Sequence, residues 1–439
     1  MNRKILELAV PNIISNLSVP LLGIVDMALM GHLDSDSYIG AIALGSLIFN
    51  FIYWGLGFLR MGTSGFTAQA RGRRDLTETI HVFARAMLIA LTMSLLLLVL
   101  QRPIEWLSFL LLKGESEVET LAVAYFRIRI WAAPAALGQF ALLGFFLGMQ
   151  NARLPMVTLL STNVINIGCN LLFVKGLGME ADGVALGTVV AQYSGLLLAF
   201  FFFRHYFRRL FKYWSLQATI RWVELKHFLK VNKDIFIRTM CLVVVFTIFT
   251  ARSASSDTGS DGQETILAVN SLLMQFFMFF SFLIDGFAHA SEALTGKFIG
   301  AGDDSSLRKS IRLLFIWGTA IGIFFTLLYL TSGGFLFRLL TDNREVISNA
   351  KPYLIWIILV PMVSYSAFLW DGIFIGATAG KEMRNAMLIS TLVVFFPAYI
   401  LAGKYLGNHG LWLAFILFMV ARSVTMQLMA GKAVYSRIS

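Results

Sequence analysis

Long runs of apolar residues, separated by short polar loops, dominate the chain. Each run is apolar around its whole circumference rather than along one stripe, which is typical of helices buried in lipid. A membrane-spanning helix needs about 20 mainly apolar residues, whereas barrel strands would alternate in polarity. The pattern therefore predicts an all-α integral membrane protein with about twelve transmembrane helices. They are expected at residues 6–30, 39–66, 80–101, 120–147, 155–176, 182–203, 232–251, 264–290, 311–332, 351–376, 385–403 and 410–430.

Composition and charge placement support a membrane protein and indicate its orientation. Only 14% of the residues are charged and 57% are hydrophobic, whereas a soluble domain carries roughly a quarter charged residues. The net charge of +11 could suggest a nucleic-acid partner. The lysines and arginines, however, lie in short loops between apolar runs, mainly in alternate loops and in the two tails. The positive-inside rule then predicts that both termini are cytoplasmic, and no nucleic-acid partner is expected.

The chain resembles itself at a shift of 228 positions. Gly72 and Asp75 align with Gly300 and Asp303, and the segment 144–148 (G-F-F-L-G) aligns with 372–376 (G-I-F-I-G). Each half would begin inside, so the pattern predicts two six-helix lobes related by a pseudo-two-fold axis along the membrane normal.

The expected domain boundaries follow from this repeat. We assign residues 1–203 to an amino-terminal lobe, 204–231 to a basic cytoplasmic linker and 232–439 to a carboxy-terminal lobe. Two such lobes with a cavity between them form an alternating-access architecture.

Asp26 is the principal candidate for ion coupling, because it lies inside the first apolar run without a lysine or arginine within one helical turn. Ionisable groups at membrane depth are costly and mark functional sites by default. Loss of hydration favours the neutral carboxyl group, so this side chain could bind a proton on one side and release it on the other. The alternatives are a neutral carboxyl group bonded to a backbone carbonyl, or an aspartate at the outer interface.

A group of asparagines in the fifth apolar run is a second candidate. Asn163, Asn166 and Asn170 are spaced three and four residues apart and therefore share one helix face. Their amides fit coordination of a cation or bonding to a protonated carboxyl group, and the alternative is hydrogen bonding between helices. Thr188 and Tyr125 are weaker single candidates in neighbouring runs.

Two further acids lie inside apolar runs of the second half. Asp285 and Asp371 align with Gly57 and Leu143 in the repeat, so neither has an acidic counterpart. Each is a candidate for function, and the alternative is a structural role, for example in an ion pair with Arg238.

Pro11 lies in the first apolar run. A proline removes one hydrogen bond from a helix interior, so the helix that carries Asp26 could bend there. The alternative is a proline in the first helical turn, where it is tolerated.

Several functional classes lack sequence support. The chain has no G-x-x-x-x-G-K loop for ATP phosphates, no H-E-x-x-H metal pair and no glycine–serine nucleophile elbow. We therefore expect neither an enzyme nor a bound cofactor. The alternative function is a flippase for a lipid-linked intermediate, which would require the intramembrane arginines to converge on a central cavity. These are Arg85, Arg127, Arg129, Arg238 and Arg422.

Four segments resemble the multidrug and toxic compound extrusion family, and within it the DNA-damage-inducible protein F subfamily. They are I-V-D-M-A-L-M-G-H-L at 24–33, L-G-F-F-L-G-M-Q-N-A-R-L-P at 143–155 followed by N-V-I-N at 163–166, D-G-F-A-H-A-S-E-A-L-T-G at 285–296, and D-G-I-F-I-G-A-T at 371–378. They occur in the family's order and span both halves of the chain.

The resemblance implies a two-lobed antiporter in which a helix-1 aspartate, here Asp26, handles the coupling proton. By the same resemblance Asn166, Thr188 and Tyr125 belong to the polar cluster around it, and Pro11 is the bending proline. Archaeal relatives carry a second acid at the place of Asn170. Its absence here favours protons over sodium.

The sequence thus predicts a secondary active efflux transporter that exchanges protons, with sodium as the alternative, for organic cationic or amphipathic compounds. The expected partners are a small drug-like substrate and membrane lipid. The expected location is the bacterial plasma (inner) membrane. One chain carries both lobes, so a monomer is sufficient.

Overall fold

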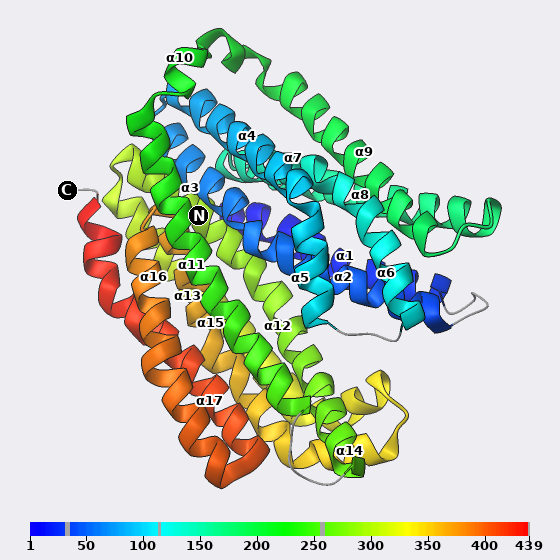
Figure 1. The fold of residues 1–439 in the computed structure, drawn as a ribbon. Coiled ribbons are helices and arrows are strands. Elements are labelled where there is room, and N and C mark those ends of the chain that lie inside the picture. The colour runs from blue at the N-terminus through cyan, green and yellow to red at the C-terminus, as the bar shows by residue number, and fades with distance from the viewer. Residues whose placement is uncertain (31–35, 113–115, 255–259, 438–439) are drawn as a thin grey trace. The chain divides into compact units, whose positions relative to one another are not determined.

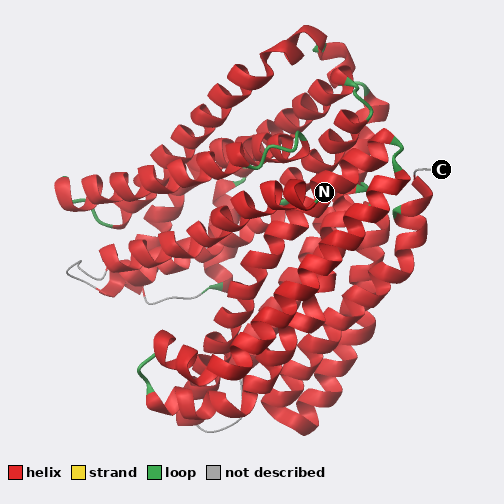
Figure 2. Cartoon of the chain, turned by 180° about the vertical axis from the view of Figure 1, so that it is seen from behind, coloured by secondary structure: helices red, strands yellow, loops and turns green. Residues whose placement is uncertain are grey.

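The computed structural model describes residues 1–30, 36–112, 116–254 and 260–437, and for residues 22, 24–30, 36 and 260–265 it describes the backbone alone. The described residues form helices joined by short loops, without strands (Figures 1 and 2). Among them are ten helical segments long and apolar enough to cross a membrane. The predicted all-helical, multi-pass membrane fold is confirmed at this level.

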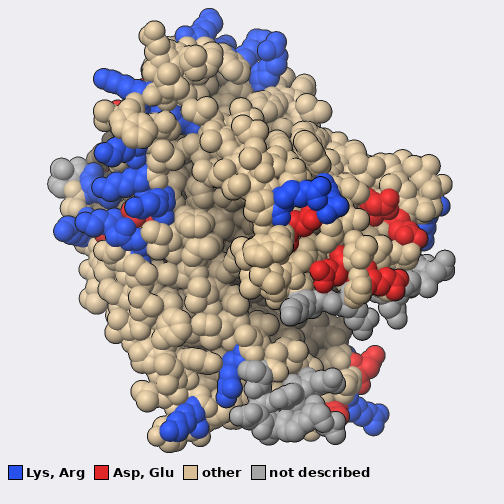
Figure 3. Space-filling view, in the orientation of Figure 1, with Lys and Arg blue, Asp and Glu red and all other residues tan. Residues whose placement is uncertain are grey.

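The helices expose large apolar side chains, as lipid-facing helices do. Leu91, Leu197 and Phe324 lie within candidate membrane spans and are 65%, 69% and 59% exposed. Charged side chains gather in patches, with wide uncharged areas between them (Figure 3). An apolar surface of this extent requires an apolar partner, which a lipid bilayer provides.

Contacts divide the chain into two compact units. The amino-terminal unit is Ile14–Leu229, and the carboxy-terminal unit is Met1–Ile13 together with Lys230–Ser439. The first helix, α1 (Asn2–Met30), therefore contributes to both units.

Eight further helices and one short turn of helix build the amino-terminal unit. They are α2 (Asp36–Leu56), α3 (Phe58–Gly72), α4 (Leu76–Val99), α5 (Gln101–Leu111), α6 (Ser116–Arg129), α7 (Ala133–Gly148), α8 (Arg153–Asn170), α9 (Ala181–Phe207) and α10 (Leu216–Thr219). Part of the core is aromatic: the Phe83 ring stacks on Phe203 at 4.3 Å between centroids, and both contact Phe145. These rings join α4, α7 and α9.

Seven helices build the carboxy-terminal unit, to which the first of them contributes from Lys230 onward. They are α11 (Trp222–Ala254), α12 (Ser260–Ala301), α13 (Asp304–Leu340), α14 (Arg344–Ala350), α15 (Leu354–Gly376), α16 (Gly380–Leu388) and α17 (Phe396–Ala433). The central helix is α15, which packs against α12, α13 and α17. The amino-terminal part of α1 also packs on α12, because a Cβ at Gly286 would meet the Ala9 carbonyl oxygen at 2.9 Å and the Ile13 amide nitrogen at 3.1 Å.

Glycines allow α7 to approach α3 at backbone distance. A Cβ added at Gly144 would meet the carbonyl oxygen of Arg60, and one added at Gly148 would meet that of Ser64 at 2.7 Å. Close helix approach through small residues is typical of membrane proteins.

The same contact recurs between α15 and α12. A Cβ at Gly372 would meet the carbonyl oxygen of Ala288, and one at Gly376 would meet that of Glu292. These residues are the repeat counterparts of the four in the amino-terminal unit. The sequence repeat therefore corresponds to a repeated helix contact.

The aligned aspartates also have one common role. Asp75 caps the start of α4 by accepting from the Glu78 amide, and Asp303 caps α13 by accepting from the Ser306 amide, both at 2.9 Å. A side chain at this position satisfies a backbone donor that the helix leaves unpaired.

Some predicted helix boundaries are wrong. The run at 39–66 is divided at Gly57 into α2 and α3, and the run at 120–147 is divided into α6 and α7 by a 3₁₀ turn. The loop predicted after residue 403 is instead a kink inside α17, where Gly407 has φ 53° and ψ −126°. Glycine adopts positive φ without the steric cost of a Cβ.

The pair Glu105–Arg127 joins α5 to α6 and provides a test of acid sensitivity. Arg127 donates to both carboxylate oxygens, at 2.9 and 2.7 Å, and lowers the pKa of Glu105. Because its pKa is lower in the folded protein, ionised Glu105 stabilises the fold at pH values above the ordinary glutamate pKa. This stabilisation is lost as the pH falls through the lowered pKa.

We expect Glu105→Gln to lower the free energy of unfolding by about 0.2–1 kcal/mol at neutral pH. We also expect the variant to lose less stability than the wild type as the pH falls. The measurement is the unfolding midpoint in detergent across the acid range. The control is Glu7→Gln, which breaks the more exposed Arg3–Glu7 pair on α1. An unchanged acid slope in Glu105→Gln would contradict the assignment.

Candidate functional site

A polar cavity of about 130 Å³ lies in the amino-terminal unit among α2, α6, α8 and α9. Tyr125 of α6, Asn166 of α8 and Thr188 of α9 line it. The Asn166 amide donates to Thr188 Oγ1 at 3.3 Å, and Thr188 donates to the Val184 carbonyl oxygen at 3.0 Å. The structure thus brings together three of the residues predicted from the sequence.

The other two asparagines of the predicted group lie differently. Asn163 lines the cavity and donates to Ser18 Oγ on α1 at 3.0 Å. Asn170 is 1% exposed and does not line the cavity; its amide donates to Asn166 Oδ1 at 3.4 Å. Gly187 of α9 makes room for it, since a Cβ there would meet Asn170 Oδ1. Asn170 therefore contacts a residue of the cavity wall from behind it.

Arg129 and Ser46 complete the cavity wall and were not among the predicted site residues. Arg129 donates to Ser46 Oγ at 2.9 Å and to the Tyr125 hydroxyl. Its guanidinium lies 5.0 Å from the centroid of the Phe49 ring, within range of a cation–π interaction. The only sequence signal for this contact is the spacing of four between Tyr125 and Arg129.

The size of the cavity limits its occupant. Sites for drug-sized ligands measure about 300–1,000 Å³, whereas a water molecule takes about 30 Å³. A cavity of about 130 Å³ with hydroxyl, amide and guanidinium groups fits water or a small ion. It does not fit a drug.

The helix that carries Asp26 is continuous through Pro11. Since α1 begins at Asn2, Pro11 lies in the helix interior, and the alternative of a first-turn proline is wrong. Asp26 lies on the described backbone of α1, but its side chain is outside the described part of the structure. Its predicted role stays a prediction.

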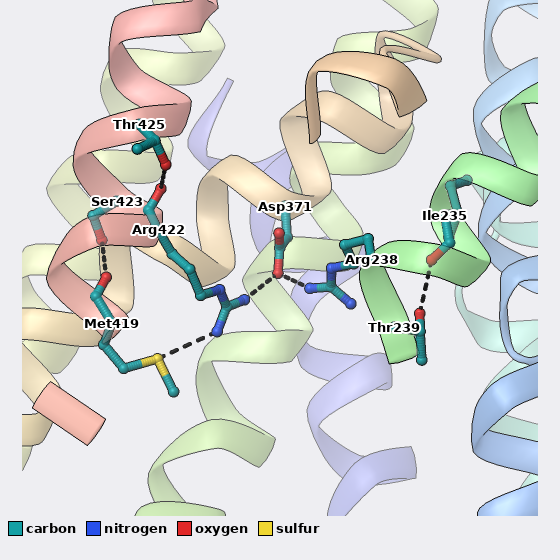
Figure 4. A network of polar contacts seen from close by, with 8 residues as sticks. All are labelled: Ile235, Arg238, Thr239, Asp371, Met419, Arg422, Ser423 and Thr425. Carbon is teal, nitrogen blue, oxygen red and sulfur yellow. Dashed lines mark hydrogen bonds and ion pairs between the residues drawn. The ribbon is translucent and has the colours of Figure 1, made fainter. Parts of the chain in front are cut away.

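Asp371 lies at the centre of an ion cluster in the carboxy-terminal unit (Figure 4). Arg238 of α11 and Arg422 of α17 both donate to its Oδ2 atom, Arg422 at 2.6 Å. The three side chains are 8%, 9% and 2% exposed for Arg238, Asp371 and Arg422. The predicted alternative of an ion pair between Asp371 and Arg238 is confirmed, and Arg422 adds a second cation.

The second arginine of the cluster, Arg422, also has a sulfur and an aromatic contact. Arg422 donates to the Met419 sulfur at 3.2 Å, and its guanidinium lies 5.5 Å from the Phe418 ring centroid. Asp285 of α12 acts electrostatically on both arginines. The bonded cluster itself joins α11, α15 and α17.

The other arginines named in the flippase alternative have local partners. Arg85 pairs with Glu78 at 2.7 Å and Arg127 pairs with Glu105, while Arg129 bonds hydroxyl groups. These three guanidiniums lie in separate contacts of the amino-terminal unit, and the two that meet in the carboxy-terminal unit, Arg238 and Arg422, share the Asp371 carboxylate. The arrangement gives no support to a flippase with a cationic pyrophosphate site.

Apolar helices, a buried ion cluster and a polar cavity define a multi-pass helical membrane protein with polar sites among its candidate membrane spans. The family model MatE matches residues 11–172 and 236–400, and the chain belongs to this family. The family predicted from the sequence is confirmed.

Named relatives agree with this assignment. The chain is 36% identical over 420 residues to DNA damage-inducible protein F of Escherichia coli (strain K12), covering 96% of this chain and 90% of the relative. It is 24% identical over 437 residues to multidrug and toxin extrusion protein 1 of Pongo abelii, covering 96% and 73%. A solved outward-facing multidrug resistance MATE family transporter shares the fold with TM-score 0.83 at 18% identity, covering 99% and 96%.

Proposed function

We propose that this protein is a secondary active efflux transporter of the bacterial inner membrane. It exchanges protons for organic, cationic or amphipathic compounds by alternating access. The observation that carries the proposal is the polar cavity lined by Tyr125, Asn166 and Thr188, in the unit that contains Asp26. Its volume suits a hydrated proton pathway, so the transported compound binds elsewhere.

The height of Asp26 along α1 can be compared with that of Asn170, the asparagine that bonds Asn166. Ser18 bonds Asn163, and both helices run outward in the proposed topology. At 1.5 Å per residue, Asp26 lies about 12 Å beyond Ser18, and Asn170 about 10 Å beyond Asn163. The two residues therefore lie at similar depth.

The number of membrane crossings in this proposal is about twelve. The structure has ten apolar segments long enough to cross a membrane, among the described residues, and α1 is not one of them. We count α1 as a further crossing, because its 29 residues suffice to span a bilayer. The segment Gly380–Arg437 has 58 residues and is interrupted by the Gly407 kink, so it provides two crossings. The repeated glycine contacts support two lobes related by a pseudo-two-fold axis.

In the proposed cycle, Asp26 takes up a proton from outside, α1 bends at Pro11 and the compound is released. Loss of the proton to the inside resets the carrier. Proton and compound then bind in mutual exclusion, which is a negative coupling between two sites.

The test is dye efflux from liposomes under an imposed pH gradient, with and without sodium. We expect wild-type protein to move a cationic dye without sodium, and Asp26→Asn to abolish this movement because asparagine cannot exchange a proton. The matched control is Asp304→Asn, an exposed acid at the start of α13. Undiminished efflux in Asp26→Asn would overturn the role of Asp26, and a strict sodium requirement would overturn proton coupling.

A further inference from the structure

A groove of about 850 Å³ lies on the carboxy-terminal unit between α13, α15 and α17. One end is polar and the other apolar. The polar end carries Arg308, Arg312, Gln427 and Tyr435, and the apolar part is formed by Phe315, Ile316, Ala320 and Ile323, with Trp370.

The polar end offers positive charge for a ligand. Arg308 pairs with Asp304 at 2.7 Å, but both side chains are exposed, at 59% and 45%, so the pair is weak. Arg312 lies one turn further along α13, is exposed and has no hydrogen-bond or ion-pair partner within the described residues. Arginine presents a fork of N–H donors that matches the oxygens of a phosphate group.

The remaining wall of the groove is suited to a hydrocarbon chain rather than to a polar ligand. Thr319 donates to the Tyr365 hydroxyl at 3.1 Å, so these two groups satisfy each other. The Phe315 ring lies 5.2 Å from the Trp370 ring between centroids, at 59° between the ring planes, and the two rings give the groove an aromatic side. Ile316 and Ile323 are 54% and 46% exposed along the same helix.

The length of the groove fits one leaflet of a bilayer. At 1.5 Å per residue, Arg312 and Ile323 are about 16 Å apart along α13. Half of a hydrocarbon core is about 15 Å thick. A ligand with a phosphate at the arginines and an alkyl chain along the groove would follow the membrane normal.

We propose that this groove is a binding site for one anionic phospholipid, with its phosphate against Arg312 and Arg308 and an acyl chain along Phe315, Ala320 and Ile323. The site is independent of the coupling ion and of the transported compound. It would regulate or stabilise the carboxy-terminal unit whichever compound the protein moves.

The test is native mass spectrometry of the detergent-purified full chain, titrated with phosphatidylglycerol or phosphatidylcholine. We expect about five-fold or greater preference for phosphatidylglycerol, since each arginine near an anionic headgroup contributes about this factor. Arg308→Gln combined with Arg312→Gln should abolish the preference. The matched control, Arg208→Gln with Arg209→Gln, removes equal charge from exposed positions in the amino-terminal unit and should keep it.

A second variant tests the apolar part. Ala320→Trp fills the groove without changing charge, and it should reduce retention of phosphatidylglycerol. The site would be overturned if the preference for phosphatidylglycerol remained in Arg308→Gln with Arg312→Gln. It would also be overturned if Arg208→Gln with Arg209→Gln lost the preference to the same extent. Displacement of the lipid by inorganic phosphate alone would indicate a phosphate site and overturn the lipid proposal. If the double variant does not fold, the test is made with Arg312→Gln, which breaks no hydrogen bond or ion pair among the described residues.

Discussion

Asp371→Asn is expected to lower the free energy of unfolding by about 3–5 kcal/mol, because it leaves two buried arginines without their counter-charge. Arg238 and Arg422 are 8% and 2% exposed and share the same carboxylate oxygen. Water cannot replace that charge at a buried position. The measurement is the unfolding midpoint in detergent, at a pH where aspartate is ionised.

The matched control is Asp304→Asn, which breaks an exposed ion pair and should cost about 0–1 kcal/mol. A triple variant, Asp371→Leu with Arg238→Met and Arg422→Met, should recover most of the loss, since apolar replacements of buried ion pairs are often neutral. A cost below about 1 kcal/mol for Asp371→Asn would contradict the structural role. A stable triple variant that cannot transport would assign the cluster a part in the transport cycle.

Gly376→Ala should destabilise the carboxy-terminal unit by about 1–3 kcal/mol, despite the higher helix propensity of alanine. The added methyl group would meet the Glu292 carbonyl oxygen, the Gly296 amide nitrogen at 2.9 Å and Thr295 Cβ at 3.0 Å. The first two are backbone atoms, which cannot rotate away, so α15 would have to move from α12.

The control for this variant lies on α13. Gly334 has nothing within 4 Å of an added Cβ, so Gly334→Ala should be stabilising by about 0.5–1 kcal/mol. The repeat predicts the same sign for Gly148→Ala as for Gly376→Ala. Unfolding midpoints of the three variants give the comparison, and a stabilised Gly376→Ala would refute the close contact.

The repeat could be predicted from sequence because its markers are residues with strict steric or capping roles. A glycine at a helix contact has no substitute, and Asp75 and Asp303 occupy the same cap position. The pairing of Asp371 with Arg238 was also accessible, because an acid and a base buried in lipid must find counter-charges.

Other features depend on contacts far apart in the chain. Arg129 belongs to the cavity wall because Ser46, on another helix, accepts its hydrogen bond. No local spacing indicates that contact. Likewise Arg422 was named only among the intramembrane arginines of the flippase alternative, since nothing in the sequence says which acid it meets. The Gly407 kink looked like a loop because glycine and polar residues are typical of both.

The division of α1 between the two units has a consequence for biosynthesis. Met1–Ile13 is translated long before its packing surface at Gly286, which is more than 270 residues further along the chain. Domains generally fold in the order of synthesis, but the carboxy-terminal unit cannot. Residues Met1–Ile13 can pack only after α12 has been made. A fragment starting at Lys230 would therefore lack Met1–Ile13, and no later residue replaces it.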